Sequence, residues 1–399
     1  MVSTGTALSR SPFRNEGENK MDETSILTKR SVNRRSLLKG GLLAGGAAIG
    51  AGMLGKGTAA LAQSGSGSGW GSRSLNDGDI AILRFLAAAE LIESDLWTQY
   101  AELGGIGKLP PNEVDPTESL NAYQNALSQL DGDGPQYISS NTLDEISHAT
   151  FLNAYLVSKG ADPVDFSQFQ NLQGSKAFSA GAQNIGRLTN LLKLNVDTSW
   201  FTRYRSKSNP DLGGGPYPQA VTINNKRAIP ATDSDLNDPN LIQVIANIAA
   251  FHFGYIEQGG SSLYAAMSRK ASGHETLHIT LGIGGDEIAH FLEWVDFAGN
   301  ACQPPVSGVS AMGVTFPNLF TSSLGSLVQP SLIFPVPAQF ISADLPLCAT
   351  IRPVTDKFAG ARATIASFTA DGLFIGQSKE FLNTLHELAD EADDAVRRF

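Results

Sequence analysis

Apolar residues recur at three- and four-residue steps along much of this chain, which is the period of an amphipathic α-helix. The pattern predicts four long helices, a final amphipathic helix and one shorter helical stretch, over 79–103, 141–158, 238–269, 275–298, 378–398 and 118–130. Asn76 or Asp77 stands where an N-cap is expected, Asp238 and Pro239 open the third long helix, and Gly160 ends the second.

Two segments lack this period. Residues 161–237 contain a run of three glycines and several prolines, and they predict a long crossover with one short helix near 186–194. Residues 301–376 are rich in Pro, Gly, Ser and Phe, so 301–399 is expected to be an irregular extension that ends in a helix. Two helices, a long connection and two more helices are the plan of a four-helix bundle. We therefore expect an all-α fold with the bundle over 77–300.

The first 62 residues have the pattern of a twin-arginine export signal. Arg34 and Arg35 precede a glycine-diluted apolar run over 40–54, and Ala60-Leu61-Ala62 is a small-x-small cleavage site. The apolar run is short for a bilayer that needs roughly 20 residues, so cleavage is favoured over a membrane anchor. Residues 63–76 are a flexible Gly/Ser leader.

Export follows from this pattern whether translation starts at Met1 or at Met21, and the sequence leaves that choice open. The twin-arginine translocation machinery is the expected partner, and the periplasm or the outside of the cell is the expected destination. No later stretch is long and apolar enough to cross a membrane, so the mature chain is expected to be soluble.

Composition narrows the classes of function. The 399 residues are 42% hydrophobic, enough to bury a core. The net charge is −10, and it becomes −15 once residues 1–62 are removed, which argues against nucleic-acid binding through phosphates. Cys302 and Cys348 are the only cysteines, so Cys-rich metal sites are excluded. These two could form a disulfide after export or remain thiols.

The chemistry is carried by a repeated motif. Three Glu-x-x-His pairs occur where chance predicts fewer than one: Glu145/His148, Glu275/His278 and Glu287/His290. The first and last follow Asp144 and Asp286, so the string Asp-Glu-x-x-His appears twice. On a helix, residues i and i+3 share a face, so such a pair can ligate one metal ion. The remaining pair opens a predicted helix and is interpreted as a surface or capping pair.

The other two long helices each offer a matching carboxylate. Glu257 is followed seven residues later by Tyr264, and Glu90 is followed seven residues later by Trp97. Glu93 lies one turn beyond Glu90 on nearly the same face, but Glu90 is preferred because its neighbours are small and apolar. Without metal, such a cluster would bury four carboxylates against two histidines, which is unfavourable.

With these motifs the chain resembles the ferritin-like superfamily, most closely exported bacterial ferritin-like domain proteins related to plant desiccation-related proteins. The resemblance covers about 77–300 without much of the crossover. It implies two metal ions, iron ahead of manganese, bound by Glu90, Glu145, His148, Glu257, Glu287 and His290. The long crossover and the C-terminal extension depart from a minimal ferritin, and they leave cage assembly and homo-oligomerisation open.

The repeated Asp residues call for a second role. Metal-bound histidines usually donate their other ring N–H to a carboxylate. We expect a crossed arrangement in which Asp144 accepts from His290 and Asp286 accepts from His148. Trp97 and Tyr264 are expected beside the ligands, and His252 is interpreted as a packing residue or a neighbour of the site.

Three functions remain open. The leading hypothesis is a di-metal carboxylate protein that handles metal with O₂ or H₂O₂, as a ferroxidase or in peroxide removal. The second is a non-enzymatic, stress-protective or metal-sequestering protein of the cell envelope. The third is an interaction module that uses the bundle as a scaffold.

Overall fold

The computed structural model describes residues 75–106, 119–204, 217–319, 321, 342, 344–346 and 359–398. These residues are mostly helical, with only four two-residue strands, which confirms the all-α class. The twin-arginine pair Arg34–Arg35, the cleavage site and Cys348 lie outside the described residues.

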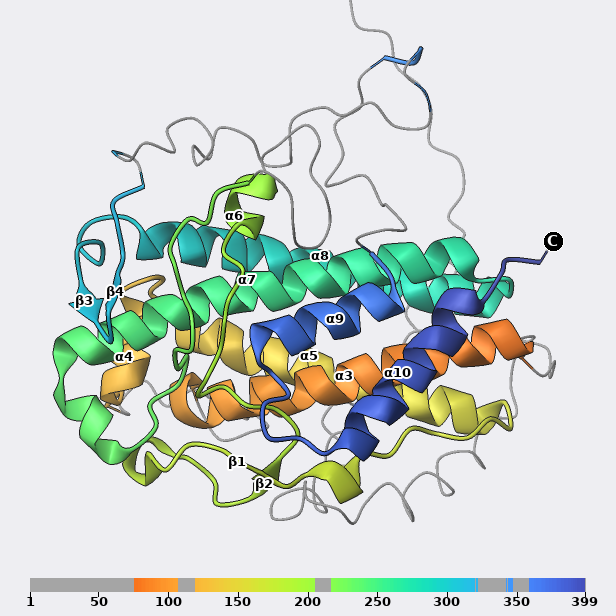
Figure 1. The fold of residues 1–399 in the computed structure, drawn as a ribbon, viewed down its shortest axis with the longest axis horizontal. Helices are drawn as coiled ribbons and strands as arrows, with labels where there is room; N and C mark the ends of the chain where they lie inside the picture. The colour runs from red at the N-terminus through yellow and green to blue at the C-terminus, as the bar shows by residue number, and fades with distance from the viewer. Residues whose placement is uncertain are drawn as a thin grey trace, which may run out of the picture. The chain divides into compact units, whose positions relative to one another are not determined.

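Four long helices dominate the described chain (Figure 1): α3 (Asp77–Gly104), α5 (Gly134–Ser158), α7 (Pro239–Lys270) and α8 (His274–Ala301). Their ends follow the expected signals. The Asn76 side chain accepts from the amide of Asp79, and the Asp238 side chain caps α7. Gly160 adopts φ 79°, a left-handed conformation that ends the turn after α5.

Helices α3 and α5 pack as an antiparallel pair. The Ser94 hydroxyl donates to the carbonyl of Glu145, and the Thr142 hydroxyl donates to the carbonyl of Trp97, each at 3.1 Å. Later residues of α3 therefore meet earlier residues of α5. Helices α7 and α8 form a second antiparallel pair. Ser268 of α7 donates to Thr280 of α8, whereas the earlier Gly260 lies beside the later Glu287.

The two pairs face each other through α3 and α7. Tyr264 donates to Glu90, and Tyr100 and His252 are hydrogen bonded at 2.7 Å, so these helices are also antiparallel. It follows that α5 and α7 point the same way. The connection between them has to return along the length of the helices, which explains why it is long.

The described part of the crossover, 161–204 and 217–237, contains only short elements: η1 (Ser167–Phe169), β1 (Leu172–Gln173), η2 (Phe178–Ala180), β2 (Gly186–Arg187), α6 (Trp200–Arg203) and η3 (Asp233–Asn237). The helix expected near 186–194 is wrong. Gly186 and Arg187 pair antiparallel with β1 instead. The amide of Thr189 donates to the Asp95 carboxylate of α3 and not to a preceding carbonyl, so tertiary hydrogen bonds replace the helical ones.

Helix α5 begins seven residues before the expected start at Asn141. Pro135 lies in its first turn, where the missing N–H of proline costs nothing, so the proline opens the helix and does not end a turn. The predicted stretch over 118–130 is the short helix α4 (Ala122–Ser128), which begins with a capping box formed by Asn121 and Gln124.

The described residues of the C-terminal extension include regular elements that its composition does not predict. It contains an antiparallel strand pair, β3 (Ser310–Ala311) with β4 (Val314–Thr315), and the helices α9 (Ala361–Asp371) and α10 (Lys379–Asp394). Helix α10 is the predicted amphipathic helix with Ser378 as its N-cap, whereas α9 was not predicted. Helix α9 packs on α7, and α10 packs on α3.

The core lies between the helices and includes stacked aromatic rings. Trp97, Phe253 and Trp294 are fully buried, and their ring centroids are 4.7–5.4 Å apart. Each large apolar side chain buried in this way contributes about 1.5–3 kcal/mol. Within the described ranges, no helix is long and apolar enough to span a membrane.

The crossover is held against α7 at Gly254. A Cβ there would come within 2.4 Å of the Trp200 ring, whose indole N–H donates to the carbonyl of Phe251. We predict that Gly254→Ala destabilises the protein by about 1–3 kcal/mol through overpacking, measured by urea unfolding. Gly285→Ala is the control, because no atom lies within 4 Å of its added Cβ, and it should stabilise α8 by about 0.5–1 kcal/mol. Equal effects of the two changes would contradict this account.

Candidate metal centre

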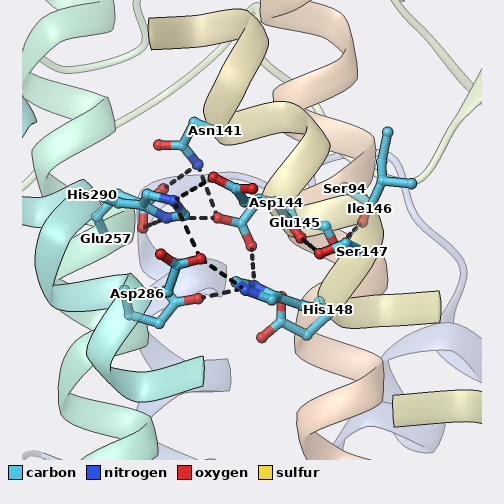
Figure 2. Close-up of polar contacts among 12 residues, drawn as sticks. Ser94, Asn141, Asp144, Glu145, Ile146, Ser147, His148, Glu257, Asp286 and His290 are labelled. Atoms are coloured by element: carbon cyan, nitrogen blue, oxygen red, sulfur yellow. Dashed lines mark hydrogen bonds and ion pairs between the residues drawn. The ribbon is translucent and has the colours of Figure 1, made fainter. Parts of the chain in front are cut away.

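All six side chains predicted as ligands come together between the four long helices. Helices α3 and α7 provide one carboxylate each, and α5 and α8 provide a carboxylate and an imidazole each. Figure 2 shows four of these side chains, Glu145, His148, Glu257 and His290, pointing toward one another. The six side chains form two overlapping groups, within each of which the ligand atoms lie within 4.8 Å of one another: Glu90, Glu145, His148 and Glu287, and Glu145, Glu257, Glu287 and His290. Glu145 and Glu287 belong to both groups, so their carboxylates are placed to bridge two positions.

Both histidines point Nδ1 into the cluster. In His148 this nitrogen lies 3.4 Å from Glu90 Oε2 and 3.4 Å from Glu145 Oε2. In His290 it lies 3.1 Å from Glu145 Oε1 and 3.4 Å from Glu257 Oε2. Each ring therefore directs its free nitrogen toward carboxylate oxygens from two different helices.

The crossed pairing of the repeated Asp residues is present. His148 Nε2 lies 3.1 Å from Asp286 Oδ2, and His290 Nε2 lies 3.4 Å from Asp144 Oδ2. Both contacts join α5 to α8. The Asp side chains are 44% and 49% exposed, so the cluster approaches solvent on this side. With Nε2–H donated to an Asp, each ring leaves Nδ1 free for a metal ion.

Burial makes the charge of the cluster costly. Glu90, Glu145, Glu257 and Glu287 are at most 1% exposed. Burial, followed by repulsion from the Glu145 charge, raises the pKa of Glu287 well above its ordinary value. Burial and the charge of Glu257 raise the pKa of Glu145 to about 7, although both histidines lower it. Protons therefore compete with any cation for these oxygens.

The two histidines keep their positive charge despite burial, because neighbouring carboxylates raise their pKa values. Burial disfavours a proton on His148, but the carboxylates of Asp286, Glu145 and Glu90 outweigh it and raise its pKa to about 12. The pKa of His290 is raised for similar reasons, with Glu257 as the largest favourable contribution. Without a metal ion, the rings hold the protons that balance the carboxylates.

The donor set fits metal ions. Buried polar atoms are normally hydrogen bonded, yet in each of the six residues at least one buried, inward atom has no hydrogen-bond partner: Oε2 of Glu90, Glu145 and Glu257, both Oε atoms of Glu287, and Nδ1 of His148 and His290. Gly260 of α7 makes room for one of them, because a Cβ there would lie 2.1 Å from Glu287 Oε2. Oxygen and imidazole donors suit iron or manganese.

Glu93 also points inward. It is 2% exposed, and its Oε2 has no hydrogen-bond partner. Burial, followed by the charge of Glu145, raises its pKa well above its ordinary value. It is absent from both groups of converging ligand atoms, so Glu90 remains the candidate ligand on α3 and Glu93 is a buried neighbour of the cluster.

Tyr264 and Trp97, both predicted to lie beside the ligands, differ in whether they contact the cluster. The Tyr264 hydroxyl donates to Glu90 Oε1, so it fixes a ligand of the opposite helix pair. Trp97 has no hydrogen-bonded contact with the cluster, and its indole Nε1 has no hydrogen-bond partner. It stacks on Trp294 with a centroid separation of 5.4 Å.

Asn141 was missed as a site residue. Its amide donates to Glu145 Oε1 at 2.9 Å and to Glu257 Oε1 at 3.1 Å, and its carbonyl oxygen accepts from the Trp294 indole at 2.7 Å. The spacing of four residues before Glu145 could have shown it, since both lie on one helix face. The sequence placed Asn141 at the start of the helix because the first two turns were not recognised.

The remaining candidates lie apart from the cluster. Glu275 of the third Glu-x-x-His pair accepts from Tyr155 and pairs with Lys159, each at 2.6 Å, so it is the surface pair expected. His386 is exposed on α10. Cys302 is buried as a thiol, and burial raises its pKa to about 12. Its partner in the predicted disulfide lies outside the described residues, so that pairing stays a prediction.

Comparison of the chain with protein-family models, with curated proteins and with solved structures found no match.

We predict that the metal-free protein loses stability as pH rises from 4.5 to about 7. Glu145 has its pKa raised over this interval on folding, so its proton is held in the folded chain and lost in the unfolded chain. The stabilisation is complete below pH 4.5 and is lost as pH rises through the folded pKa. Urea unfolding of chelator-treated protein across this range measures it. Glu145→Gln should make the decline smaller without abolishing it, because burial also raises the pKa values of Glu287 and Glu93. A rise in stability with pH would contradict the argument.

We predict that Asp144→Asn or Asp286→Asn preserves the fold and weakens metal affinity by roughly 10–100-fold, because the His Nε2–H loses its carboxylate acceptor. Titration with Fe(II) or Mn(II) measures the change. Asp296→Asn, on the exposed face of α8, is the matched control and should have no effect. Wild-type affinity in both Asp variants would show that the Asp–His contacts do not support the metal centre.

Proposed function

We propose that this chain is an exported, ferritin-like four-helix-bundle protein that holds two metal ions and lets them react with oxygen or peroxide. The two antiparallel helix pairs and the long connection between the parallel helices α5 and α7 support the ferritin-like assignment. The Arg34–Arg35 pair and the Ala60-Leu61-Ala62 site support export by the twin-arginine pathway. Iron is proposed ahead of manganese.

One observation carries the proposal. Inward atoms without a hydrogen bond occur in all six predicted ligands, although the His Nδ1 atoms lie within ion-pair distance of the carboxylates, and these residues divide into two groups that share Glu145 and Glu287. A polar network built only for stability would leave few such atoms, since each costs about 1–3 kcal/mol. Two cations would satisfy them together and would balance the four buried carboxylates.

The residues of this chain have separable tasks at such a centre. Glu90 and His148 would hold one ion, Glu257 and His290 the other, and Glu145 and Glu287 both. Bound metal would supply the electrons that reduce O₂ or peroxide.

Neighbouring residues fix the ligands. Asp144 and Asp286 orient the two imidazole rings, Asn141 holds two carboxylates, and Tyr264 donates to a third. Because the carboxylates are buried between the helices, bulk water is kept from them, and small oxidants would approach on the side of the two Asp residues.

We predict that Glu145→Ala or Glu287→Ala removes at least one bound metal ion while the helices stay folded, because apolar faces supply most of the helical stability. Elemental analysis of protein purified from its exported fraction measures the metal content, and circular dichroism checks the fold. Glu275→Ala is the matched control, since it changes the Glu-x-x-His pair that lies outside the cluster. Two ions retained in either cluster variant would refute the ligand assignment.

Peroxide or O₂ consumption by the protein loaded with Fe(II) or Mn(II) then separates two functions. Consumption that is lost in the Glu145 and Glu287 variants supports an oxidoreductase. Stable metal binding without consumption supports the alternative of a non-enzymatic, metal-sequestering protein of the envelope.

A further inference from the structure

A second buried polar group lies away from the metal ligands. Tyr100 of α3, His252 of α7 and Asp371 at the end of α9 form a chain of hydrogen bonds. The Tyr100 oxygen lies 2.7 Å from His252 Nδ1, and His252 Nε2 lies 3.0 Å from Asp371 Oδ2. All three side chains are at most 1% exposed.

One tautomer satisfies both hydrogen bonds. The Asp371 carboxylate accepts from Nε2–H of His252, which leaves Nδ1 as an acceptor for the Tyr100 hydroxyl. Burial raises the pKa of Tyr100 well above its ordinary value, so the phenol keeps its proton at rest. A buried phenol, Tyr100, is therefore hydrogen bonded to a base, His252, whose ring is oriented by the Asp371 carboxylate.

Aromatic contacts join this group to the metal cluster. Trp97 lies 5.7 Å from Tyr100 and 5.4 Å from Trp294, measured between ring centroids. The Trp294 indole donates to Asn141, whose amide donates to Glu145 and to Glu257. The chain of contacts from ligand to phenol is continuous, and its rings are fully buried.

We propose that Tyr100 is a redox-active tyrosine, which gives an electron toward the metal cluster through Trp97 and Trp294 and gives its proton to His252. In the step, the phenolic O–H bond breaks, an N–H bond forms at His252 Nδ1, and one electron leaves the ring. The products are a neutral tyrosyl radical and an imidazolium paired with Asp371. The electron acceptor is a metal pair oxidised by peroxide or O₂, so this role rests on the proposed function.

Trp97 and Tyr100 are suited to different parts of this transfer. Among the described residues the Trp97 Nε1–H has no hydrogen-bond partner, so none of them offers an oxidised Trp97 a base to which it can lose its proton. Tyr100 has such a base in His252. The oxidised state therefore comes to rest on Tyr100 and not on the indole.

Two other buried tyrosines donate to acceptors of a different kind. Tyr123 is fully buried, but its hydroxyl donates to the carbonyl of Ala228, which is too weak a base to accept the proton. Tyr264 donates to Glu90, whose carboxylate would be engaged by metal in the loaded protein. Tyr100 alone among these three has an imidazole nitrogen as its hydrogen-bond partner.

We predict that a tyrosyl radical forms in the full-length protein and is lost in Tyr100→Phe. Metal-free protein is oxidised with photogenerated tris(bipyridine)ruthenium(III), and Fe(II)-loaded protein is oxidised with H₂O₂. Electron paramagnetic resonance is recorded after radicals on exposed tyrosines have decayed. Tyr123→Phe is the matched control and should keep the radical, whereas His252→Gln should lose it and Trp97→Phe should slow its formation. Tyr100→Phe keeps the ring, so it tests the proposal even if the His252 variant fails to fold.

A radical that persists in Tyr100→Phe, or that disappears instead in Tyr264→Phe or Tyr123→Phe, would overturn the assignment. So would the absence of a radical in the wild type under both treatments. A Tyr100-dependent radical in metal-free protein that binds no metal would retain the redox-active tyrosine and refute the proposed function. Metal binding at the cluster with a radical independent of Tyr100 would support the metal centre and refute the role of Tyr100.

Discussion

The structure depends on burying four carboxylates and two imidazoles between helices that are otherwise packed by apolar side chains. Such a cluster is unfavourable in a low-dielectric interior unless protons or cations balance it. In this protein the cost is reflected in the pKa values of Glu145, Glu287 and His148, which are all raised, so that protons are bound more tightly. The same burial that makes these charges costly also brings together donor atoms of the kind that hold cations.

Polar cross-links hold the helices in the register that this cluster needs. The two Asp–His contacts join α5 to α8, Asn141 joins α5 to both α7 and α8, and Tyr264 joins α7 to α3. Each link involves a predicted ligand, except the one between Asn141 and Trp294, which lies four residues after His290. Shape and chemistry are coupled here, because a shift of any helix by one turn would break both a cross-link and the ligand set.

The C-terminal extension takes part in the interior. Asp371 lies at the end of α9, where Gly372 adopts φ 89°, and it reaches the buried His252 of α7. A helix with little sequence signal thereby supplies the carboxylate that orients a buried base. The packing of α9 on α7 and of α10 on α3 makes this region part of the protein core and not a separate appendage.

Features that depend on local spacing could be predicted from the sequence alone. Helical period and capping residues located the long helices, and Asp-Glu-x-x-His identified the two pairs of candidate ligands because residues three apart share a helix face. Contacts between distant segments became visible only in the folded structure. Asn141 reaches Glu257 across 116 residues, His252 reaches Asp371 across 119, and the segment after Gly186 bonds to Asp95 in place of forming a helix. Such contacts have no local period, since their geometry exists only after the helices have packed.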